Sequence, residues 1–207
     1  MKIVLLGSTG QIGQSILRAL LTKTSHQVVQ LIAPQSESTA RSINKKFTAE
    51  QQGRLTTESV DLLSCRVRRF YPSEYGMHHV YRPPGDEVGY LHPMWTTKSA
   101  ANEACLHHPA IKSGSMTYTL IGCGDFYNQS REETWCPWTN PKASEYTLHI
   151  LGDADATIDF THIDDLGDFI VETIKHPERS ENRTLNFVSD HISYNEIARL
   201  LEKYSGR

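Results

Sequence analysis

The first third of the chain alternates between short apolar runs and stretches of helical periodicity. Ile3–Leu6 is a run of four apolar residues that ends at a glycine, which predicts a strand buried on both faces. From Gln11 onward, apolar residues recur with the spacing of one helix face. These residues are Ile12, Ile16, Leu17, Leu20 and Leu21. The pattern therefore predicts a buried strand followed directly by an amphipathic helix.

Strands and helices continue to alternate along the rest of the chain. We expect further strands over Gln27–Ala33, Ser59–Leu63, Arg69–Tyr71, Met116–Ile121, Tyr146–Leu151 and Leu185–Val188. We expect helices over about Ser38–Gln52, over Trp95–His107, from a cap at Asp164 or Asp165 to Ile174, and from the capping box Ser193–Glu196 to Tyr204. This alternation is typical of an α/β fold with a mostly parallel sheet.

Composition and charge narrow the possible partners. The net charge is −3 without a basic block, so direct contact with nucleic acid is not expected. The first apolar run is too short for a signal peptide, and no run approaches the ~20 apolar residues of a membrane span. The four cysteines form no CxxC pair, which indicates reduced, buried thiols in a cytoplasmic protein. Nothing in the sequence indicates an oligomer.

Three glycines connect the first strand to the first helix in the sequence GSTGQIG. In a dinucleotide cradle such glycines allow a tight turn, close approach of the backbone to the pyrophosphate, and close helix packing. The residues expected to hold the pyrophosphate are Gly7, Ser8, Thr9, Gly10, Gln11, Ile12 and Gly13. The spacing is GxxGxxG rather than GxGxxG, and the alternative is a turn that merely requires glycine.

The end of the second strand normally distinguishes the two nicotinamide cofactors. An acid there binds the ribose 2′-hydroxyl of NAD, whereas an arginine suits the 2′-phosphate of NADP. This chain has Ala33 and Pro34 at that point, with Arg41, Lys45 and Lys46 further on. We therefore expect NADP(H) rather than NAD(H), with Ala33 and Lys45 near the adenosine. The alternative for these cations is a solvated surface.

Four segments together resemble a known family. GSTGQIG, RRFYPSEYG, TYTLIGCGDFY and DFTHIDDLGDFIVETI are similar to segments of the NmrA-like and isoflavone-reductase-like family of atypical short-chain dehydrogenases, in its fungal branch. The resemblance covers the whole chain. It implies a Rossmann-like, doubly wound fold, NADPH as cofactor, and reduction of a small, often aromatic, secondary metabolite. It also leaves open a regulator that binds the dinucleotide without catalysis.

A lysine is the candidate for the chemical step. No tyrosine has a lysine four residues later, so the usual short-chain dehydrogenase signature is absent. The resemblance implies a catalytic lysine on the helix after the PSEYG loop, and Lys98 is the only lysine on that predicted helix. A desolvated lysine can donate a proton as hydride arrives. In the plant reductases, however, counting back from the TYT strand places this lysine near Ala104, so a structural role for Lys98 stays open.

Other candidates follow predicted strands, where ligands of open α/β sheets bind. Pro72, Ser73 and Tyr75 follow one strand, and Tyr75 could flank the nicotinamide while Glu74 hydrogen-bonds locally. Gly122 and Phe126 follow another strand and would lie against the ring. Trp135, Pro137 and Trp138 could line an aromatic pocket or fasten a loop. The adjacent pairs His78–His79 and His107–His108 point apart, so no metal site is expected.

Two pieces of the family pattern are absent from this sequence. Only Ser64–Arg68 separate the expected third strand from Arg69, whereas a parallel crossover needs a dozen residues or more. The fold therefore lacks one central strand–helix unit, and the chain ends before the helices that cover the substrate in the family. We expect either a break in the chain between Leu63 and Arg69, or a hairpin that places Arg69–Tyr71 antiparallel to the third strand.

These gaps shape the expected domain organisation and activity. We expect one NAD(P)-binding domain over residues 1–207, in which residues 125–160 and 185–207 contribute a small substrate-side subdomain. The leading hypothesis is an NADPH-dependent reductase. The alternatives are a non-catalytic NAD(P)-binding sensor and an inactive truncated product.

Overall fold

The computed structural model describes residues 1–58, 67–75, 93–129, 136–140, 142–150 and 152–205. These residues belong to two compact units. Unit 1 comprises Met1–Cys65, Tyr127–Asn140 and His162–Lys175, and unit 2 comprises Arg66–Phe126, Pro141–Thr161 and His176–Arg207. Each unit has its own parallel sheet, and the expected α/β class with mostly parallel strands is confirmed. None of the described helices combines the length and the apolar character that a membrane span requires.

Unit 1 is built on a three-stranded parallel sheet. Its strands are β1 (Lys2–Leu6), β2 (Gln27–Leu31) and β3 (Leu55–Glu58), in the order β1-β2-β3. Helix α1 (Gln11–Lys23) follows β1, as the periodicity predicted, and buries Ile16, Leu17, Leu20 and Leu21. The guanidinium of Arg54 closes the far end of α1 by donating to the carbonyls of Leu21, Thr24 and His26 at 2.7–3.1 Å.

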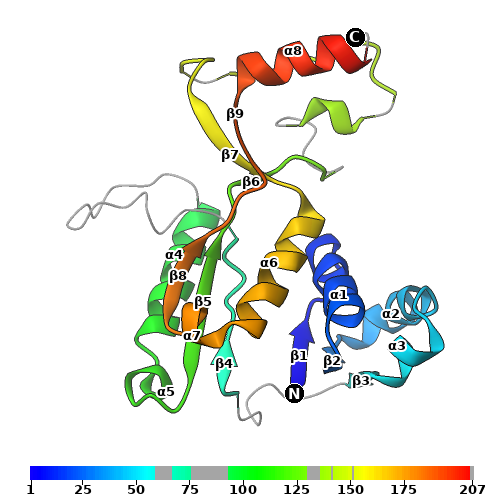
Figure 1. The fold of residues 1–207 in the computed structure, drawn as a ribbon, viewed down its shortest axis with the longest axis vertical. Coiled ribbons are helices and arrows are strands. Elements are labelled where there is room, and N and C mark those ends of the chain that lie inside the picture. The colour runs from blue at the N-terminus through cyan, green and yellow to red at the C-terminus, as the bar shows by residue number, and fades with distance from the viewer. Residues whose placement is uncertain (59–66, 76–92, 130–135, 141, 151, 206–207) are drawn as a thin grey trace. The chain divides into compact units, whose positions relative to one another are not determined.

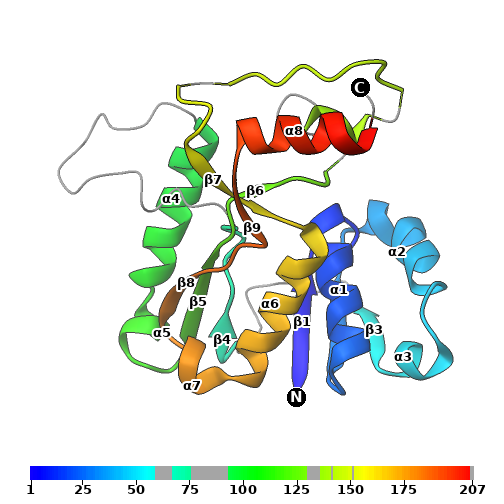
Figure 2. The ribbon, with the colours of Figure 1, turned by 45° about the horizontal axis from the view of Figure 1, so that its top comes forward.

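Helix α6 (Ile163–Lys175) packs against α1 within unit 1, and the two helices run side by side in Figures 1 and 2. The approach is close, because a Cβ on Gly167 would lie 3.0 Å from both Ala19 Cβ and Ser15 O. The prediction that Asp164 or Asp165 caps this helix is wrong, since both lie in its first turn. Asp164 instead accepts hydrogen bonds from Ser15 Oγ at 2.8 Å and Arg18 at 2.9 Å, which tie the helices together.

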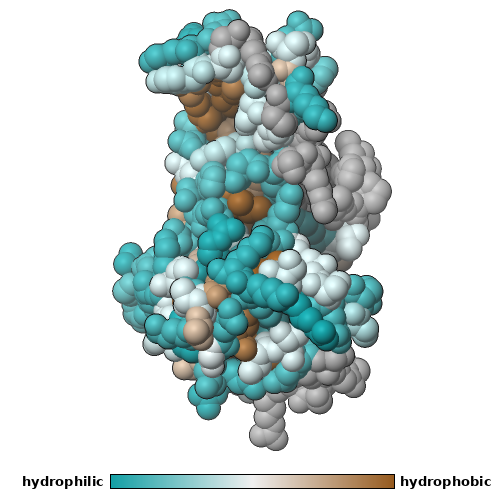
Figure 3. All heavy atoms as spheres, turned by 90° about the vertical axis from the view of Figure 1, so that its right-hand side faces the viewer, coloured by the Kyte–Doolittle hydropathy of each residue, from teal (hydrophilic) through white to brown (hydrophobic). Residues whose placement is uncertain are grey.

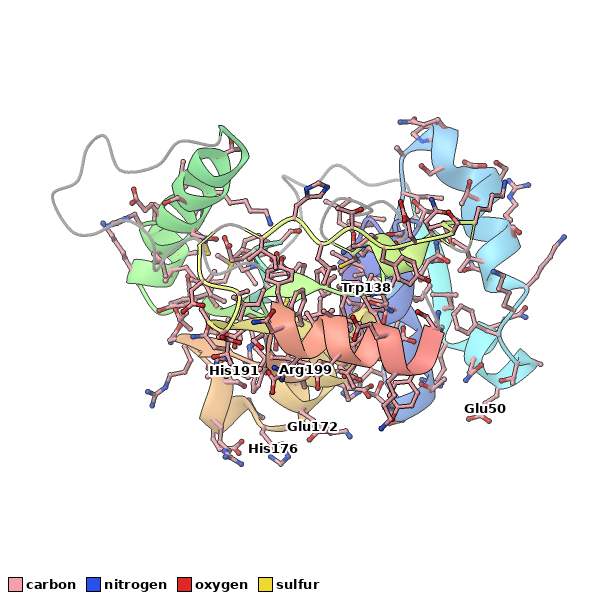
Figure 4. All side chains as sticks on the ribbon, turned by 90° about the horizontal axis from the view of Figure 1, so that it is seen from above. Glu50, Trp138, Glu172, His176, His191 and Arg199 are labelled. Atoms are coloured by element: carbon pink, nitrogen blue, oxygen red, sulfur yellow. The ribbon has the colours of Figure 1, made fainter. Side chains whose placement is uncertain are left out.

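The helix predicted over Ser38–Gln52 is broken in the structure. A 3-10 turn (Pro34–Ser36) leads into α2 (Glu37–Asn44), and a separate α3 (Ala49–Gly53) follows. The break has a local cause, because Thr48 and Gln51 form a capping box that starts a new helix. Hydrophilic residues dominate the face of the molecule over α2 and α3 (Figure 3), where Glu50 projects from α3 (Figure 4).

Unit 2 contains a second parallel sheet. Its strands are β4 (Arg69–Phe70), β5 (Thr117–Gly122) and β8 (Arg183–Asn186), in the order β4-β5-β8. Helix α4 (Pro93–Leu106), predicted over Trp95–His107, runs alongside β5 in Figures 1 and 2, and the short α5 (Pro109–Lys112) follows it. A third short helix, α7 (Pro177–Ser180), leads into β8. Strand β8 begins two residues before its predicted start at Leu185.

A smaller mixed sheet completes unit 2. Strand β7 (Thr157–Thr161) pairs in parallel with β6 (Asp125–Phe126) and antiparallel with β9 (Asp190–Ser193). The strand predicted over Tyr146–Leu151 is wrong, because residues 146–150 are irregular and β7 starts at Thr157. The predicted capping box is confirmed: Ser193 N donates to Glu196 at 2.9 Å and Glu196 N to Ser193 Oγ at 3.2 Å, starting α8 (Tyr194–Ser205). The hydrogen bonds that the Ser193 N–H and the Ser193 hydroxyl donate to the carboxylate lower the pKa of Glu196.

Strand β1 is less buried than its apolar run predicted. Ile3 and Leu5 are half-buried, but Val4 is 46% exposed and Leu6 is 62% exposed. The prediction of burial on both faces is therefore wrong. The physical reason is that Val4 and Leu6 lie on the same face of the strand, and the described residues do not cover that face.

The expected third strand at Ser59–Leu63 and the junction up to residue 66 lie outside the described residues. The observed β3 ends just before, at Glu58. Residues 69–70 do form the expected short strand, and β4 pairs in parallel with β5 through Arg69–Thr117 and Phe70–Tyr118. Whether residues 69–71 also lie antiparallel beside the third strand depends on Ser59–Leu63, so the hairpin alternative stays a prediction. The expected break in the chain falls on residues that the structure does not describe.

Candidate functional site

The turn between β1 and α1, residues 7–13, has the geometry expected of a phosphate cradle, and we call it the glycine turn. Gly7 has a φ of +78°, which favours glycine, and its carbonyl accepts the N–H of Gly10 at 3.0 Å. A Cβ on Gly13 would lie 2.1 Å from the Gly7 carbonyl oxygen, so only glycine lets the helix pack this closely. The structure therefore requires glycine at the first and third positions of the motif, as a dinucleotide cradle does.

The start of α1 is open toward an anion. No side chain caps the helix at Gly10, and its first turn has no acidic residue. Gly7, Gly10 and Gln11 are exposed, while Thr9 and Ile12 are half-buried. Since helix N-termini attract negative charge, this arrangement fits a phosphate group. A Cβ on Gly10 would meet only the Gly7 oxygen, at 3.5 Å, so the space beside Gly10 is open within the protein.

A buried network of polar side chains supports the glycine turn, and the sequence patterns did not predict it. Gln30 of β2 is fully buried and donates to Ser8 Oγ at 3.0 Å. Its side-chain oxygen accepts from Asn44 at 2.8 Å and from Thr57 at 3.2 Å. The sequence signal for this network is a glutamine inside an otherwise apolar strand, because buried polar groups require hydrogen-bond partners.

The predicted adenosine contacts also lie in unit 1. Ala33 is exposed just after β2, at the carboxyl edge of the sheet. Lys45 is exposed and directly follows Asn44, whose amide joins the network that reaches Ser8. Arg41 pairs with Glu37 at 2.9 Å on the surface of α2. The structure thus connects the end of α2 to the glycine turn, and the contact of Lys45 with a 2′-phosphate stays a prediction.

In unit 2, the segment after β4 meets the end of β5. Tyr75 forms a parallel bridge with Gly122, and Cys123 N donates to the Tyr75 carbonyl at 3.1 Å. Tyr75 has a φ of +53°, an uncommon conformation for a residue with a side chain. Such strained backbone tends to occur at functional sites. The structure therefore brings the predicted residues Pro72, Ser73, Tyr75 and Gly122 to one edge of this sheet, while Gly76 lies outside the described residues.

Lys98 reaches the same place from α4. Its ammonium donates to the backbone carbonyl of Glu74 at 2.7 Å. One helical turn later, the Asn102 amide donates to the carboxylate of Glu74, and both side chains are buried. Ala104, the other candidate position for a family lysine, is exposed. We call Glu74, Tyr75, Lys98, Asn102 and Cys123 the Lys98 cluster.

The cluster is a low-dielectric environment. Burial raises the pKa of the Cys123 thiol to about 12, with the Lys98 ammonium opposing and the Asp125 and Glu74 carboxylates adding to the shift. Burial likewise raises the pKa of the Tyr75 phenol to about 12. Tyr75 is therefore protonated near neutral pH and is not an activated base. This agrees with the absence of the Tyr-x-x-x-Lys signature.

Phe126 lies four residues beyond Gly122, in β6, and is half-buried. The turn between them passes close to β7, because a Cβ on Gly124 would lie 2.2 Å from the Asp159 carbonyl oxygen. Thr161 Oγ1 donates to the Cys123 carbonyl at 2.5 Å. Hydrogen bonds to Tyr75 and to Thr161 of β7 therefore fix the segment between β5 and β6.

The remaining candidates have local roles. Trp138 (labelled in Figure 4) donates its indole N–H to the Tyr127 carbonyl at 2.8 Å, which fastens its own loop. His107 contacts the Glu103 carbonyl and His108 caps α5, so these two neighbours act separately. Among the described residues, no group of three or more His, Cys, Asp or Glu side chains could hold a metal. Cys105, Cys123 and Cys136 are buried as predicted, whereas Cys65, His78, His79 and Trp135 lie outside the described residues.

Comparison with known proteins supports this fold. The chain is 24% identical over 240 residues to the phenylcoumaran benzylic ether reductase PT1 of Pinus taeda, which covers 98% of this chain and 74% of the relative. No family model matches the chain. The 240 aligned positions exceed the 207 residues of the chain, so this relative has residues without a counterpart here.

Solved structures show the same fold. An isoflavone reductase matches with a TM-score of 0.70 at 17% identity, covering 100% of this chain and 76% of that one. A complex of leucoanthocyanidin reductase with NADPH from Vitis vinifera matches with a TM-score of 0.70 at 18% identity and the same coverage. A UDP-glucuronic acid 4-epimerase from Bacillus cereus matches with a TM-score of 0.70 at 19% identity. The fold is therefore Rossmann-like, and the solved structures that share it include reductases of the isoflavone-reductase type and this epimerase.

Proposed function

We propose that this chain is a cytoplasmic, NADPH-dependent reductase of a small aromatic secondary metabolite, of the fungal isoflavone-reductase-like type. The observation that carries the proposal is the placement of Lys98: its ammonium is held 2.7 Å from the Glu74 carbonyl, next to the carboxyl end of β5. Ligands of parallel α/β sheets bind at that edge. The resemblance to reductases, one of them solved with NADPH, supports the same conclusion.

The residues present fit a dinucleotide. The positive φ of Gly7, the close packing at Gly13 and the uncapped start of α1 make a cradle for a pyrophosphate. We assign the pyrophosphate to residues 7–13 and the adenosine end to Ala33 and Lys45. We assign the nicotinamide end to Pro72, Ser73, Tyr75, Lys98, Gly122 and Phe126. When bound, NADPH supplies the hydride.

The protein's own contribution to the reaction is a proton. Lys98 Nζ holds three protons and uses one to bind the Glu74 carbonyl, so others are available to an oxygen of the substrate. A partly buried ammonium beside a developing negative charge is an effective general acid. Apart from Thr161 at the end of β7, the mixed sheet β6-β7-β9 and α8 fall within residues 125–160 and 185–207, and we propose that they form the substrate side.

The test is turnover. The purified chain is incubated with NADPH and a panel of phenylcoumarans, isoflavonoids and leucoanthocyanidins, and NADPH oxidation is followed by absorbance. Lys98→Ala is expected to lower kcat roughly 100-fold or more with NADPH affinity nearly unchanged. Lys112, in the neighbouring α5, provides the matched control, and Lys112→Ala is expected to retain full kcat. Full kcat in Lys98→Ala would remove Lys98 from the mechanism.

A second candidate is a sensor that binds NADPH without catalysis. It is favoured by the exposure of Val4 and Leu6 on β1, whose only strand neighbour among the described residues is β2. Tight binding of NADPH by calorimetry without turnover on the panel would support this candidate. Turnover would exclude it.

A further inference from the structure

Glu74 is a buried acid whose position serves no evident purpose for stability. Its side chain is 1% exposed, and Asn102 donates to one carboxylate oxygen, Oε2. The other oxygen, Oε1, is buried and has no hydrogen-bond partner among the described residues. A half-satisfied buried carboxylate is costly, and an apolar side chain of similar size would cost less. A costly group of this kind calls for a functional explanation.

The contacts of Glu74 form a closed ring through α4. Lys98 and Asn102 are four residues apart and therefore project from the same side of the helix. Lys98 binds the main-chain carbonyl of Glu74, and Asn102 binds its side chain. The turn that presents Glu74 is itself anchored to β5 through the Tyr75–Gly122 bridge. The ring thus fixes α4 to the carboxyl end of β5 at the point where Lys98 lies.

Both charges of the ring act on the Cys123 thiol. The Lys98 ammonium lowers the pKa of Cys123, and the Glu74 carboxylate raises it. A lysine side chain loses rotamer entropy when it is fixed, so it stays in one place only if its surroundings hold it. The Glu74 carbonyl holds the ammonium in this way, because the Glu74 side chain is itself bonded to Asn102 on the same helix.

We propose that Asn102 and Glu74 are positioning residues for Lys98: the Asn102–Glu74 bond sets the carbonyl that holds the Lys98 ammonium in place for proton transfer. This inference rests on the proposed reductase function. It adds two residues to the site, neither of which contacts cofactor or substrate in the proposal.

A double-mutant cycle tests the proposal in the full chain. Asn102→Ala is expected to lower kcat roughly 10- to 100-fold with little change in KM for NADPH, because a small displacement of a catalytic group is costly. In a Lys98→Ala background the same change is expected to have no further effect on kcat. Cys105→Ala is the matched control, since Cys105 is buried on the same helix and its thiol cannot replace the amide that binds Glu74. Additive losses in the cycle would overturn the proposal.

A second measurement needs no turnover. The amines are acylated briefly with acetic anhydride, and the modification of Lys98 is compared by mass spectrometry with that of exposed Lys45. Asn102→Ala is expected to raise acylation of Lys98 relative to Lys45 several-fold, and Cys105→Ala to leave it unchanged. An unchanged ratio in Asn102→Ala overturns the positioning role. A raised ratio in a chain without reductase turnover refutes the proposed function and leaves the positioning role intact.

Discussion

The glycine turn of unit 1 and the Lys98 cluster of unit 2 both lie at carboxyl ends of parallel strands, but they are built differently. The turn consists of seven consecutive residues whose backbone is determined by three glycines. The cluster joins three segments, and its central hydrogen bond links residues that are 28 positions apart. A local motif can therefore be recognised in a sequence, whereas a cluster of long-range contacts can be recognised only after folding.

The largest expected effect tests the glycine turn, which is the local motif of the two. Gly13→Ala places a Cβ 2.1 Å from the Gly7 carbonyl, and the backbone cannot move without displacing α1. We expect a loss of roughly 3 kcal/mol in the free energy of unfolding, measured by urea denaturation.

Gly10→Ala is the matched control for this experiment, because its Cβ meets its nearest neighbour at an ordinary 3.5 Å. It is expected to keep the stability and to weaken NADPH binding roughly 10-fold by occupying the space of the phosphates. Equal stability losses in the two variants would contradict the different roles given to these glycines.

A smaller effect shows how far the turn depends on distant residues. Gln30→Met keeps the length of the side chain but removes the partner of Ser8, Asn44 and Thr57. We expect a loss of about 1–3 kcal/mol, since three polar groups lose their partner. The stability of Gln27→Met, a change at an exposed position of the same strand, serves as the reference. No difference between the two would show that the turn is determined by its glycines alone.

The smallest effect concerns the Lys98 cluster and alkaline pH. Burial raises the pKa of Cys123 from its ordinary 9.0, and that of Tyr75 from 10.0, to about 12 in each case. The folded chain therefore keeps protons that the unfolded chain releases, and the stabilisation is complete below pH 9 and decreases as the pH rises toward 12. We expect a loss of about 1 kcal/mol between pH 8 and pH 10 in thermal unfolding. Cys123→Ala should lose less over this interval, and an equal loss would exclude Cys123 as a cause.

The sequence predicted those parts of the molecule that local patterns determine. The strand–turn–helix at the N-terminus, helix α4 and the capping box at Ser193 all follow from spacing within a dozen residues. The errors in the predicted elements had two different causes. A short capping box at Thr48 outweighed the helical pattern of Ser38–Gln52, and the apolar run at Ile3–Leu6 could not show that one face of β1 would lack a cover.

The candidate site divides in the same way. Lys98 was predicted from its helix and the resemblance, and the glycine turn from its spacing. The buried carboxylate of Glu74, its bond to Asn102 and the network of Gln30 were not predicted as such, because each depends on a partner that is distant in sequence. A polar residue in a buried segment signals that a partner exists but does not identify it.

Strand β1 also has a consequence for the handling of the protein. Among the described residues β1 has a partner strand on one edge only, and two of its apolar side chains are exposed. An unpaired strand edge is a template on which further strands can assemble, so we expect this segment to promote aggregation. Natural edges are often protected by a lysine, and β1 begins with Lys2, whose ammonium lies 3.9 Å from Glu58. Because dissolved salt screens such charges, low ionic strength is the condition under which a concentrated solution of this chain should remain clear.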